Sequence, residues 1–323
     1  MEPIFLNKLD NFEMILHVIG YKNEGESIVF ILKQGKNIYF SSVIDSYEQN
    51  NCNFTENLLK QQYNLAKLDY IFWTHPHEDH SLGLEDIISN YSSNKTVFIT
   101  PQDIENSKDN LNDSEVNILE KMLMNAGKYK FQKTSVNDGG ENTIYKRNFL
   151  LDSEEYTFTI KSLSPHSGVL EEIKKNKTKE VNDFSICLLF KISSNRGYEY
   201  SMLLTGDIEN KTIRLLQDSL LKEVHFLKIP HHSSESASIL PERIQNNYKD
   251  IMIACTTSYK KGYLPRENIL KKYLRNYKNI FILGREKEEV NANYGVLTIQ
   301  GSLKDFNFTY YLDGIFEEFS SQN

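Results

Sequence analysis

The sequence predicts a four-layer αββα sandwich, a mixed α/β fold (α+β) in one domain that spans residues 1–323. Two observations predict it. Short runs rich in β-branched and aromatic residues occur in an early group and again in a late group, which indicates two sheets packed face to face. Amphipathic stretches with helical spacing lie between and after these runs, and helices that bury one apolar face cover sheets from the outside.

The early strands follow one another as in a meander. They are expected at residues 14–20, 26–33, 37–43 and 68–74. The late strands are expected at residues 156–163, 184–192, 200–205, 224–229, 251–255, 279–283, 295–299 and 306–311. Helices are expected at residues 55–65, 84–91, 114–125, 211–221, 240–247 and 266–277. Polar stretches without periodicity, at residues 106–113, 138–145 and 171–182, are expected as loops.

The composition excludes several classes of protein. A chain of 323 residues with 39% hydrophobic content can bury a substantial core. Its 37 basic and 44 acidic residues give a net charge of −7, so no overall field draws it onto nucleic acid or an anionic membrane. Cys52, Cys187 and Cys255 are too scattered for a disulfide framework. No apolar run approaches about 18 residues and no signal-peptide pattern is present, so we expect a cytoplasmic protein without a membrane contact.

The segment DYIFWTHPHEDHSLGL, residues 69–84, carries the strongest chemical signal. An apolar strand runs directly into His75, His77, Asp79 and His80. Imidazole and carboxylate groups are the ligands that a borderline divalent metal prefers, and a turn at a strand end lets close neighbours converge on one point. We expect His75 and His77 to bind one metal ion, and Asp79 and His80 to bind a second.

This segment resembles the H-x-H-x-D-H signature of metallo-β-lactamase-fold hydrolases. The wider chain is similar to ComEC-type competence proteins and to phosphorylcholine esterases in its first hairpin, which ends at Asp45, and in the later segments NDFSICLLF, SMLLTGDIE and HFLKIPHHSS. The resemblance spans about residues 14–299. It implies a metal-dependent hydrolase with two divalent ions, zinc or manganese. It also implies that Asp45 steadies the turn that carries the metal ligands.

Later positions complete the implied site. Asp207 ends a strand and opens a helix, where a carboxylate can bridge ions held about 3.5–4 Å apart, as the resemblance implies; the alternative is a helix N-cap. His231 and His232 are adjacent on a turn and point in different directions. The resemblance favours His232 as a metal ligand and His231 as an acid or electrostatic aid. His166, in SLSPHSG, is either a further ligand or part of an exposed loop.

One departure from the resemblance bears on the substrate. Competence-type proteins carry a G-H-P turn where this chain has Leu264 before a proline. Nearby, Tyr259, Lys260 and Lys261 are candidates to bind a phosphate, with an ordinary solvated loop as the alternative. The substrate class is therefore the least constrained part of the interpretation.

Hydrolysis of a phosphodiester, with DNA or RNA among the substrates, is the first functional hypothesis. Two ions activate a shared water and neutralise the leaving oxygen, and Asp79 is placed to hold a proton of that water. The expected catalytic residues are therefore Asp79 and His231. A small phosphodiester, such as a cyclic nucleotide or a choline phosphodiester, is the second hypothesis and suits the acidic composition. A metal-bound or degenerate component of a larger complex is the third, which Leu264 supports and the intact first motif opposes.

Overall fold

The computed structural model describes residues 3–7, 11–126, 129–151, 153–176, 180–247, 251–286 and 292–320. Its strands form two sheets. The nine-stranded sheet has the order β1 (Ile4–Phe5), β8 (Asn142–Leu151), β9 (Glu154–Ser162), β10 (Leu188–Ser194), β11 (Glu199–Leu204), β12 (Phe226–Lys228), β13 (Ile253–Thr257), β14 (Asn279–Leu283) and β17 (Phe316–Ser320). The eight-stranded sheet has the order β16 (Asn307–Gly314), β15 (Tyr294–Ser302), β2 (Phe12–Tyr21), β3 (Glu26–Gln34), β4 (Asn37–Ile44), β5 (Tyr70–Phe72), β6 (Val97–Pro101) and β7 (Lys130–Thr134).

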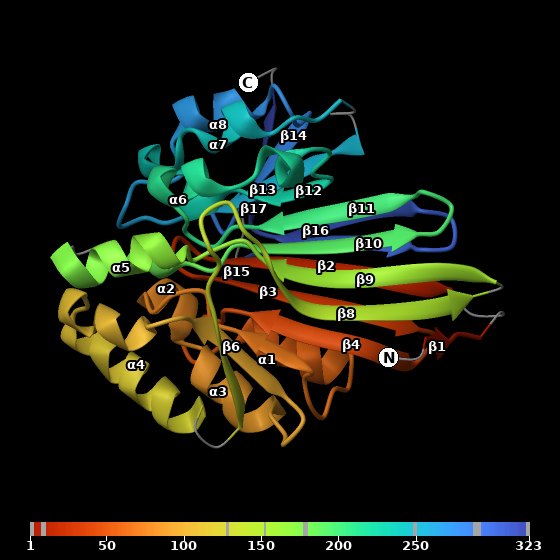
Figure 1. The fold of residues 1–323 in the computed structure, drawn as a ribbon, viewed down its shortest axis with the longest axis horizontal. Coiled ribbons are helices and arrows are strands. Elements are labelled where there is room, and N and C mark those ends of the chain that lie inside the picture. Colours follow the sequence, from red (N-terminus) through yellow and green to blue (C-terminus); the bar gives the residue numbers. More distant parts are fainter. Residues whose placement is uncertain are drawn as a thin grey trace.

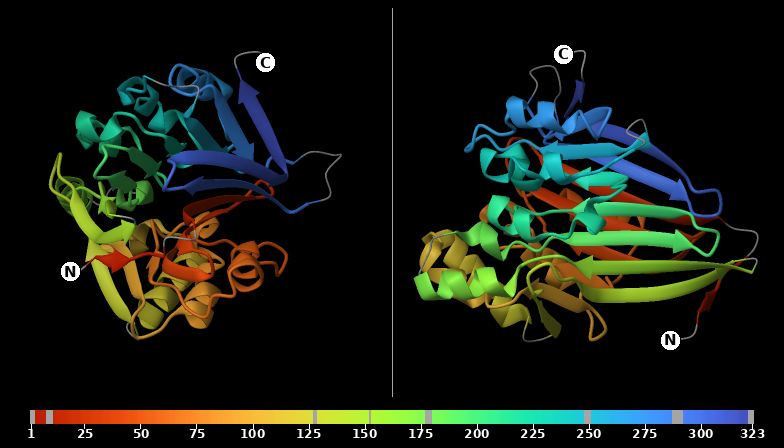
Figure 2. Two further views of the ribbon diagram at one scale, coloured as in Figure 1. Left: turned by 90° about the vertical axis from the view of Figure 1, so that its right-hand side faces the viewer. Right: turned by 45° about the horizontal axis from the view of Figure 1, so that its top comes forward.

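Helices cover the outer faces of both sheets. They are α1 (Phe54–Asn57), α2 (Glu78–Ser81), α3 (Leu84–Tyr91), α4 (Asp113–Ala126), α5 (Ser167–Asn176), α6 (Asn210–Leu215), α7 (Leu240–Arg243) and α8 (Glu267–Tyr273). Figures 1 and 2 show α1, α3 and α4 on one side of the molecule and α6, α7 and α8 on the other. In the described part of the chain, no helix combines the length and the apolar character needed to cross a membrane.

Three apolar clusters separate these layers. Between the sheets, Phe30 of β3 stacks on Phe158 of β9 with ring centroids 5.1 Å apart. Alternate residues of β3 face opposite ways, so Val29 and Ile31 join the outer cluster that also holds Ile88 of α3. A third cluster packs α7 and α8 onto the nine-stranded sheet. Because both faces of β3 are covered, its sequence is a continuous apolar run. The αββα sandwich predicted from the sequence is therefore the architecture of the protein.

Parallel pairing positions the turns that matter for function. Strands β4 to β7 are parallel neighbours in the eight-stranded sheet, and β11 to β14 are parallel neighbours in the nine-stranded sheet. Parallel strands end at one edge of their sheet, and ligand sites in α/β sheets form beyond those carboxyl ends. The turns after β4, β5, β11 and β12 carry Asp45, His75, Asp207 and His232.

The two groups of strands seen in the sequence do not correspond to the two sheets. The hairpin of β15 and β16 comes late in the chain, yet β15 pairs with β2 in the eight-stranded sheet. At the other end, β1 pairs with β8 of the nine-stranded sheet. These pairings join distant segments, and a local pattern of apolar residues does not encode them.

Several local predictions are wrong. The expected loop at residues 138–145 overlaps the start of β8, which pairs along β9 despite its polar sequence. The expected loop at residues 171–182 contains the end of α5, while residues 177–179 lie outside the described chain. The strand expected from residue 184 begins only at Leu188, after a 3-10 turn over Val181–Phe184.

The helix expected at residues 240–247 ends early, because Ile244 is extended and Gln245 forms a bridge with Lys222. Strands β6, β7 and β17 were not among the strands expected from the sequence.

Candidate metal centre

The turn after β5 presents the histidine motif at the edge of the sandwich. His77 precedes α2, and that single turn of helix brings Asp79 and His80 back toward the sheet edge. The turn is held from inside, since the Trp73 Nε1–H donates to Ser81 Oγ (2.9 Å) and Ser81 Oγ–H donates to the His77 carbonyl (2.6 Å). His75 and His80 are fully buried, whereas His77 is half-buried.

Asp45 lies behind this turn, in the left-handed conformation with φ of 54°. One of its carboxylate oxygens accepts from the Thr74 N–H (2.7 Å). The other accepts from the Thr74 hydroxyl (2.6 Å) and lies 2.7 Å from His80 Nδ1. A carboxylate can only accept here, so His80 donates from Nδ1 and directs Nε2 away from Asp45.

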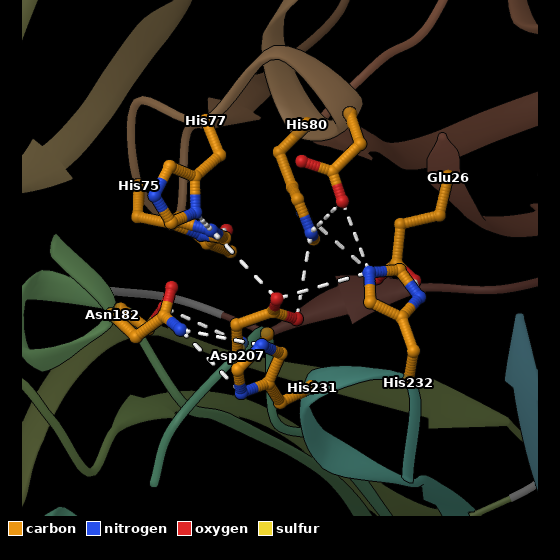
Figure 3. A network of polar contacts seen from close by, with 12 residues as sticks. Glu26, His75, His77, His80, Asn182, Asp207, His231 and His232 are labelled. Atoms are coloured by element: carbon orange, nitrogen blue, oxygen red, sulfur yellow. Dashed lines mark hydrogen bonds and ion pairs between the residues drawn. The ribbon is translucent and has the colours of Figure 1, made fainter. Parts of the chain in front are cut away.

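Four buried side chains converge in front of His80. We call Asp79, His80, Asp207 and His232 the four-residue cluster, because each offers one donor atom and these atoms lie within 4.8 Å of one another. His232 Nε2 is 3.0 Å from Asp79 Oδ2, and His80 Nε2 is 3.4 Å from Asp207 Oδ1. Figure 3 shows the two imidazoles and Asp207 facing a common point.

The chemistry of the four-residue cluster fits a divalent cation. His80 Nε2 and Asp207 Oδ1 are buried and make no hydrogen bond with the described residues. Burial opposes protonation of His80, yet the carboxylates of Asp207 and Asp79 outweigh it and raise the pKa of His80 well above its ordinary value. Crowded buried carboxylates need a positive charge nearby. Two imidazole nitrogens and two carboxylates supply the N and O ligands that such a metal takes.

His75 and His77 lie on the other side of Asp207. His75 Nε2 is 3.1 Å from His77 Nδ1 and 3.9 Å from Asp207 Oδ2. Burial, with the neighbouring His80 and His77, lowers the pKa of His75 well below its ordinary value, so its imidazole is neutral and able to donate a lone pair. Asp207 thus lies between the other members of the four-residue cluster, on one side, and His75 and His77, on the other (Figure 3).

The turn that carries Asp207 is hydrogen-bonded to the turn that carries His232. Gly206 adopts a left-handed conformation, where an added Cβ would meet Thr74 and the Ile186 carbonyl at 3.3 Å. Its carbonyl accepts from the His231 N–H. Beyond Pro230, His231, His232 and Ser233 are all left-handed, with φ of 47°, 48° and 65°. Consecutive non-glycine residues in this region are strained, and such strain persists only where the surrounding structure enforces it, commonly at functional sites.

The two adjacent histidines have different surroundings. His232 is buried within the four-residue cluster, whereas the side chain of His231 keeps 22% of its exposure. His231 Nδ1 lies 2.9 Å from Glu209 Oε1 and 3.0 Å from Ser236 Oγ. Burial opposes protonation of His231, but the carboxylates of Asp207 and Glu209 raise its pKa. The geometry therefore separates a donor, His232, from a neighbour with its own polar partners, as the resemblance favours.

His166 is fully buried, so the exposed-loop alternative is wrong. Its Nδ1 lies 3.3 Å from the Asn137 carbonyl, and its Nε2 has no hydrogen-bond partner among the described residues. The loop is tied to the site through Ser185, whose carbonyl accepts from Ser164 Oγ and whose hydroxyl accepts from the Asp207 N–H.

The loop that holds the candidate phosphate-binding residues lies over the site. The Tyr259 ring stacks on His232, with centroids 5.1 Å apart and planes 15° from parallel. Lys261 Nζ is 3.7 Å from a carboxylate oxygen of Glu78, and Lys261 is exposed. Lys260 is also exposed. Leu264 is buried and its backbone pairs with Tyr259, so it closes this loop.

Some residues around the centre were not identified from the sequence. They are Glu26, Asn182, Glu209, Lys228, Ser236 and Thr257. Glu26 begins a strand of the eight-stranded sheet and Thr257 ends one of the nine-stranded sheet, so only their meeting shows that they act together. Lys228 lies within the HFLKIPHHSS segment, on which the resemblance to a known family partly rests, so the sequence did contain a signal for it. The histidines outside the site have partners, since His17 contacts Thr298 and Tyr63, and the Ser201 N–H donates to His225.

A comparison with known protein families finds a match to the segment that contains the histidine motif. The model of the metallo-beta-lactamase superfamily matches residues 43–97, which include Asp45 and the histidine motif. No curated protein matches the sequence significantly. Asp207 and His232 lie outside the matched segment, so their place in the site comes from the geometry.

Several solved structures resemble the whole chain at low identity. A diphosphatase of the PhnP family is 12% identical, with 95% of this chain and 97% of that chain covered and a TM-score of 0.42. The metallo-beta-lactamase fold protein YhfI from Bacillus subtilis is 12% identical, with 84% and 95% covered and a TM-score of 0.38. A probable metal-dependent hydrolase from Staphylococcus aureus is 12% identical, with 94% and 98% covered and a TM-score of 0.33. Such likenesses bear on neither substrate nor mechanism.

Proposed function

We propose that this protein is a metal-dependent hydrolase that cleaves a phosphodiester with water, using two divalent ions, zinc or manganese. The observation that carries the proposal is the position of Asp207. Its carboxylate lies 3.4 Å from His80 Nε2 on one side and 3.9 Å from His75 Nε2 on the other. A carboxylate shared between two ions occupies such a position. The superfamily match over residues 43–97 supports hydrolysis as the reaction class.

The residues divide into two sets of ligands. The four-residue cluster would hold one ion, and His75, His77 and Asp207 would hold the other, with His166 as a further donor. Bound ions of this kind lower the pKa of a water and neutralise charge on the leaving oxygen. The protein supplies the rigid frame, since Asp45 and the turn around Thr74 hold the ligands in place before substrate arrives.

Asp79 and His231 are the proposed catalytic residues. The Asp79 carboxylate faces the same point as His80 and His232, where it would accept a hydrogen bond from the attacking water and orient it. His231 is partly exposed beside Asp207, and its Nδ1 is tied to Glu209. Its Nε2, which lies 3.4 Å from the Asn182 amide nitrogen, would donate a proton to the oxygen that departs from phosphorus.

DNA or RNA is the first proposed substrate, in keeping with the resemblance to ComEC-type proteins. The exposed ammonium groups of Lys260 and Lys261, next to Tyr259, would meet its phosphates. A small phosphodiester is the second candidate, and the net charge of −7 favours it because a polyanion is repelled at long range.

A substrate panel tests the proposal. Protein reconstituted with Zn²⁺ or Mn²⁺ is incubated with single- and double-stranded DNA, RNA, cyclic dinucleotides, a choline phosphodiester and a chromogenic phosphodiester, with Asp207→Asn as the control. We expect cleavage by the wild type only. Cleavage of a polymer that declines steeply with salt supports a nuclease, because phosphate contacts release counterions. Cleavage of none of them contradicts the proposal and favours a binding component of a larger complex.

A further inference from the structure

Glu26 lies directly behind the four-residue cluster although it is far from the motif turns in sequence. Its Oε1 is 3.9 Å from His80 Nδ1, and its Oε2 is 3.7 Å from His232 Nδ1. Both contacts are to the ring nitrogens that face away from the cluster. Glu26 is 2% exposed, so it does not reach substrate. Figure 3 shows Glu26 beside the His232 ring.

A threonine connects Glu26 to His232. The Thr257 hydroxyl donates to Glu26 Oε2 at 2.5 Å, and Thr257 Oγ1 is 2.8 Å from His232 Nδ1. The hydroxyl has one hydrogen, and the carboxylate takes it. Thr257 Oγ1 must therefore accept from His232, which places the His232 hydrogen on Nδ1 and leaves the lone pair of Nε2 facing Asp79 and Asp207.

Lys228 completes this buried arrangement. Its ammonium lies 2.7 Å from Glu26 Oε2, and neither side chain is exposed by more than 2%. A buried carboxylate without a partner is costly, and removal of one member of a buried ion pair is strongly destabilising. Lys228 therefore compensates the charge of Glu26 while the Thr257 hydroxyl carries the hydrogen bond to His232.

The same arrangement recurs at His75. The Thr74 hydroxyl donates to Asp45, and Thr74 Oγ1 lies 3.0 Å from His75 Nδ1. Thr74 thus stands between His75 and a carboxylate as Thr257 stands between His232 and Glu26. Its recurrence in the turn after β5, a strand of the other sheet, indicates a common purpose, which is to fix the ring hydrogen on Nδ1.

We propose that Thr257 and Glu26 are positioning residues, which hold His232 in the tautomer that presents Nε2 to a divalent metal ion in the four-residue cluster. The proposal rests on the proposed function, since it requires that this cluster bind a metal. Outer partners of ligand imidazoles typically change metal affinity by about 10–100-fold.

Substitutions at Thr257 test it without disturbing the buried ion pair. Thr257→Val keeps the shape and removes the hydroxyl, and Thr257→Ser restores it. Thr256→Val is the matched control, because Thr256 is the preceding residue of β13, is equally buried, and its hydroxyl has no partner among the described residues. Affinity of metal-free protein for Zn²⁺ is measured by calorimetry, with thermal unfolding of the metal-free proteins recorded in parallel.

We expect Thr257→Val to weaken the tightest site by about 10-fold or more, and the other two variants to remain within about threefold of the wild type. Affinity of Thr257→Val within that range overturns the proposal, as does an equal loss in Thr256→Val, which would indicate general packing. If the wild type binds no metal, the proposed function itself is wrong. The three variants then show no difference in Zn²⁺ affinity from the wild type.

A spectroscopic measurement gives an independent readout. Long-range ¹H–¹⁵N correlation spectra of the zinc-loaded protein distinguish a ring hydrogen on Nδ1 from one on Nε2. We expect His232 to carry it on Nδ1 in the wild type and in Thr257→Ser. A His232 hydrogen on Nε2 in the wild type overturns the proposal.

Glu26→Gln is a second variant. We expect its folded fraction to show the same loss of Zn²⁺ affinity as Thr257→Val.

Discussion

The two sides of Asp207 differ in how firmly their histidines are held. In the four-residue cluster, His80 donates directly to Asp45, and His232 donates through Thr257 to Glu26. On the other side, His75 has the equivalent relay through Thr74, but His77 is half-buried and its ring contacts His75 itself. A rigid, buried ligand set loses less freedom when it binds an ion. We therefore expect the four-residue cluster to be the tighter site.

The largest expected effect comes from the residue that both sides share. Asp207→Asn keeps the size of the side chain and removes the charge that holds two cations close together. We expect hydrolysis to fall by at least about 100-fold, which is roughly 2.7 kcal/mol of transition-state stabilisation. Steady-state kinetics on the cleaved substrate measure it, with circular dichroism to establish that the variant is folded. A near wild-type rate in a folded variant would show that Asp207 is not shared by two ions.

Removal of one ligand from each side distinguishes the two sites. His232→Ala should weaken the tighter of two binding steps by about 100-fold or more, because loss of an outer partner alone costs about 10–100-fold. His77→Ala should leave that step unchanged and weaken only the second. Calorimetric titration of metal-free protein with Zn²⁺ separates the steps. The order of filling proposed above fails if His77→Ala abolishes the first step.

His166 tests whether the weaker side has a fourth ligand besides His75, His77 and Asp207. Its buried Nε2 lacks a partner among the described residues, which predicts that His166→Ala lowers the affinity of the second step by about 10-fold. The first step should not change. Elemental analysis after dialysis against limiting zinc measures the number of zinc ions per chain in His166→Ala and in the wild type. Unaltered binding in both steps would remove His166 from the site.

The smallest expected effect is at the loop over the cluster. Lys261→Ala removes one exposed positive charge next to Tyr259, so KM for a phosphodiester should rise by about threefold at low salt, since exposed charges act weakly and are screened. The value of kcat should remain near that of the wild type. Lys95→Ala, at an exposed position beyond α3, is the control. Equal KM values for the two variants would place the substrate elsewhere.

Local sequence was sufficient where one segment contains its own signal. Helix α3 and strand β14 have the bounds that their apolar spacing predicts, Leu84–Tyr91 and Asn279–Leu283. The pairing of strands could not be predicted from local sequence. β15 returns to β2 across almost the whole chain, and β8 forms from a polar segment because β9 offers it a partner along its length. Hydrogen bonds to a distant strand in the case of β15, and to the neighbouring strand in the case of β8, outweighed local propensity.

The types of ligand group at the candidate site could be predicted from the sequence alone. An apolar strand followed by His75, His77, Asp79 and His80 can supply only nitrogen and carboxylate ligands, and these select a divalent metal. The sequence also located the turn, because close neighbours at a strand end must converge.

The directions and partners of the other side chains depend on how the chain folds. The adjacent His231 and His232 are chemically identical, and the left-handed turn directs one to Glu209 and the other into the four-residue cluster. Glu26 and Thr257 are ordinary strand residues until two sheets bring them together behind His232. The physical reason is that the type of a side chain depends on the sequence alone, whereas the direction and tautomer of an imidazole depend on the partner that packing places against it.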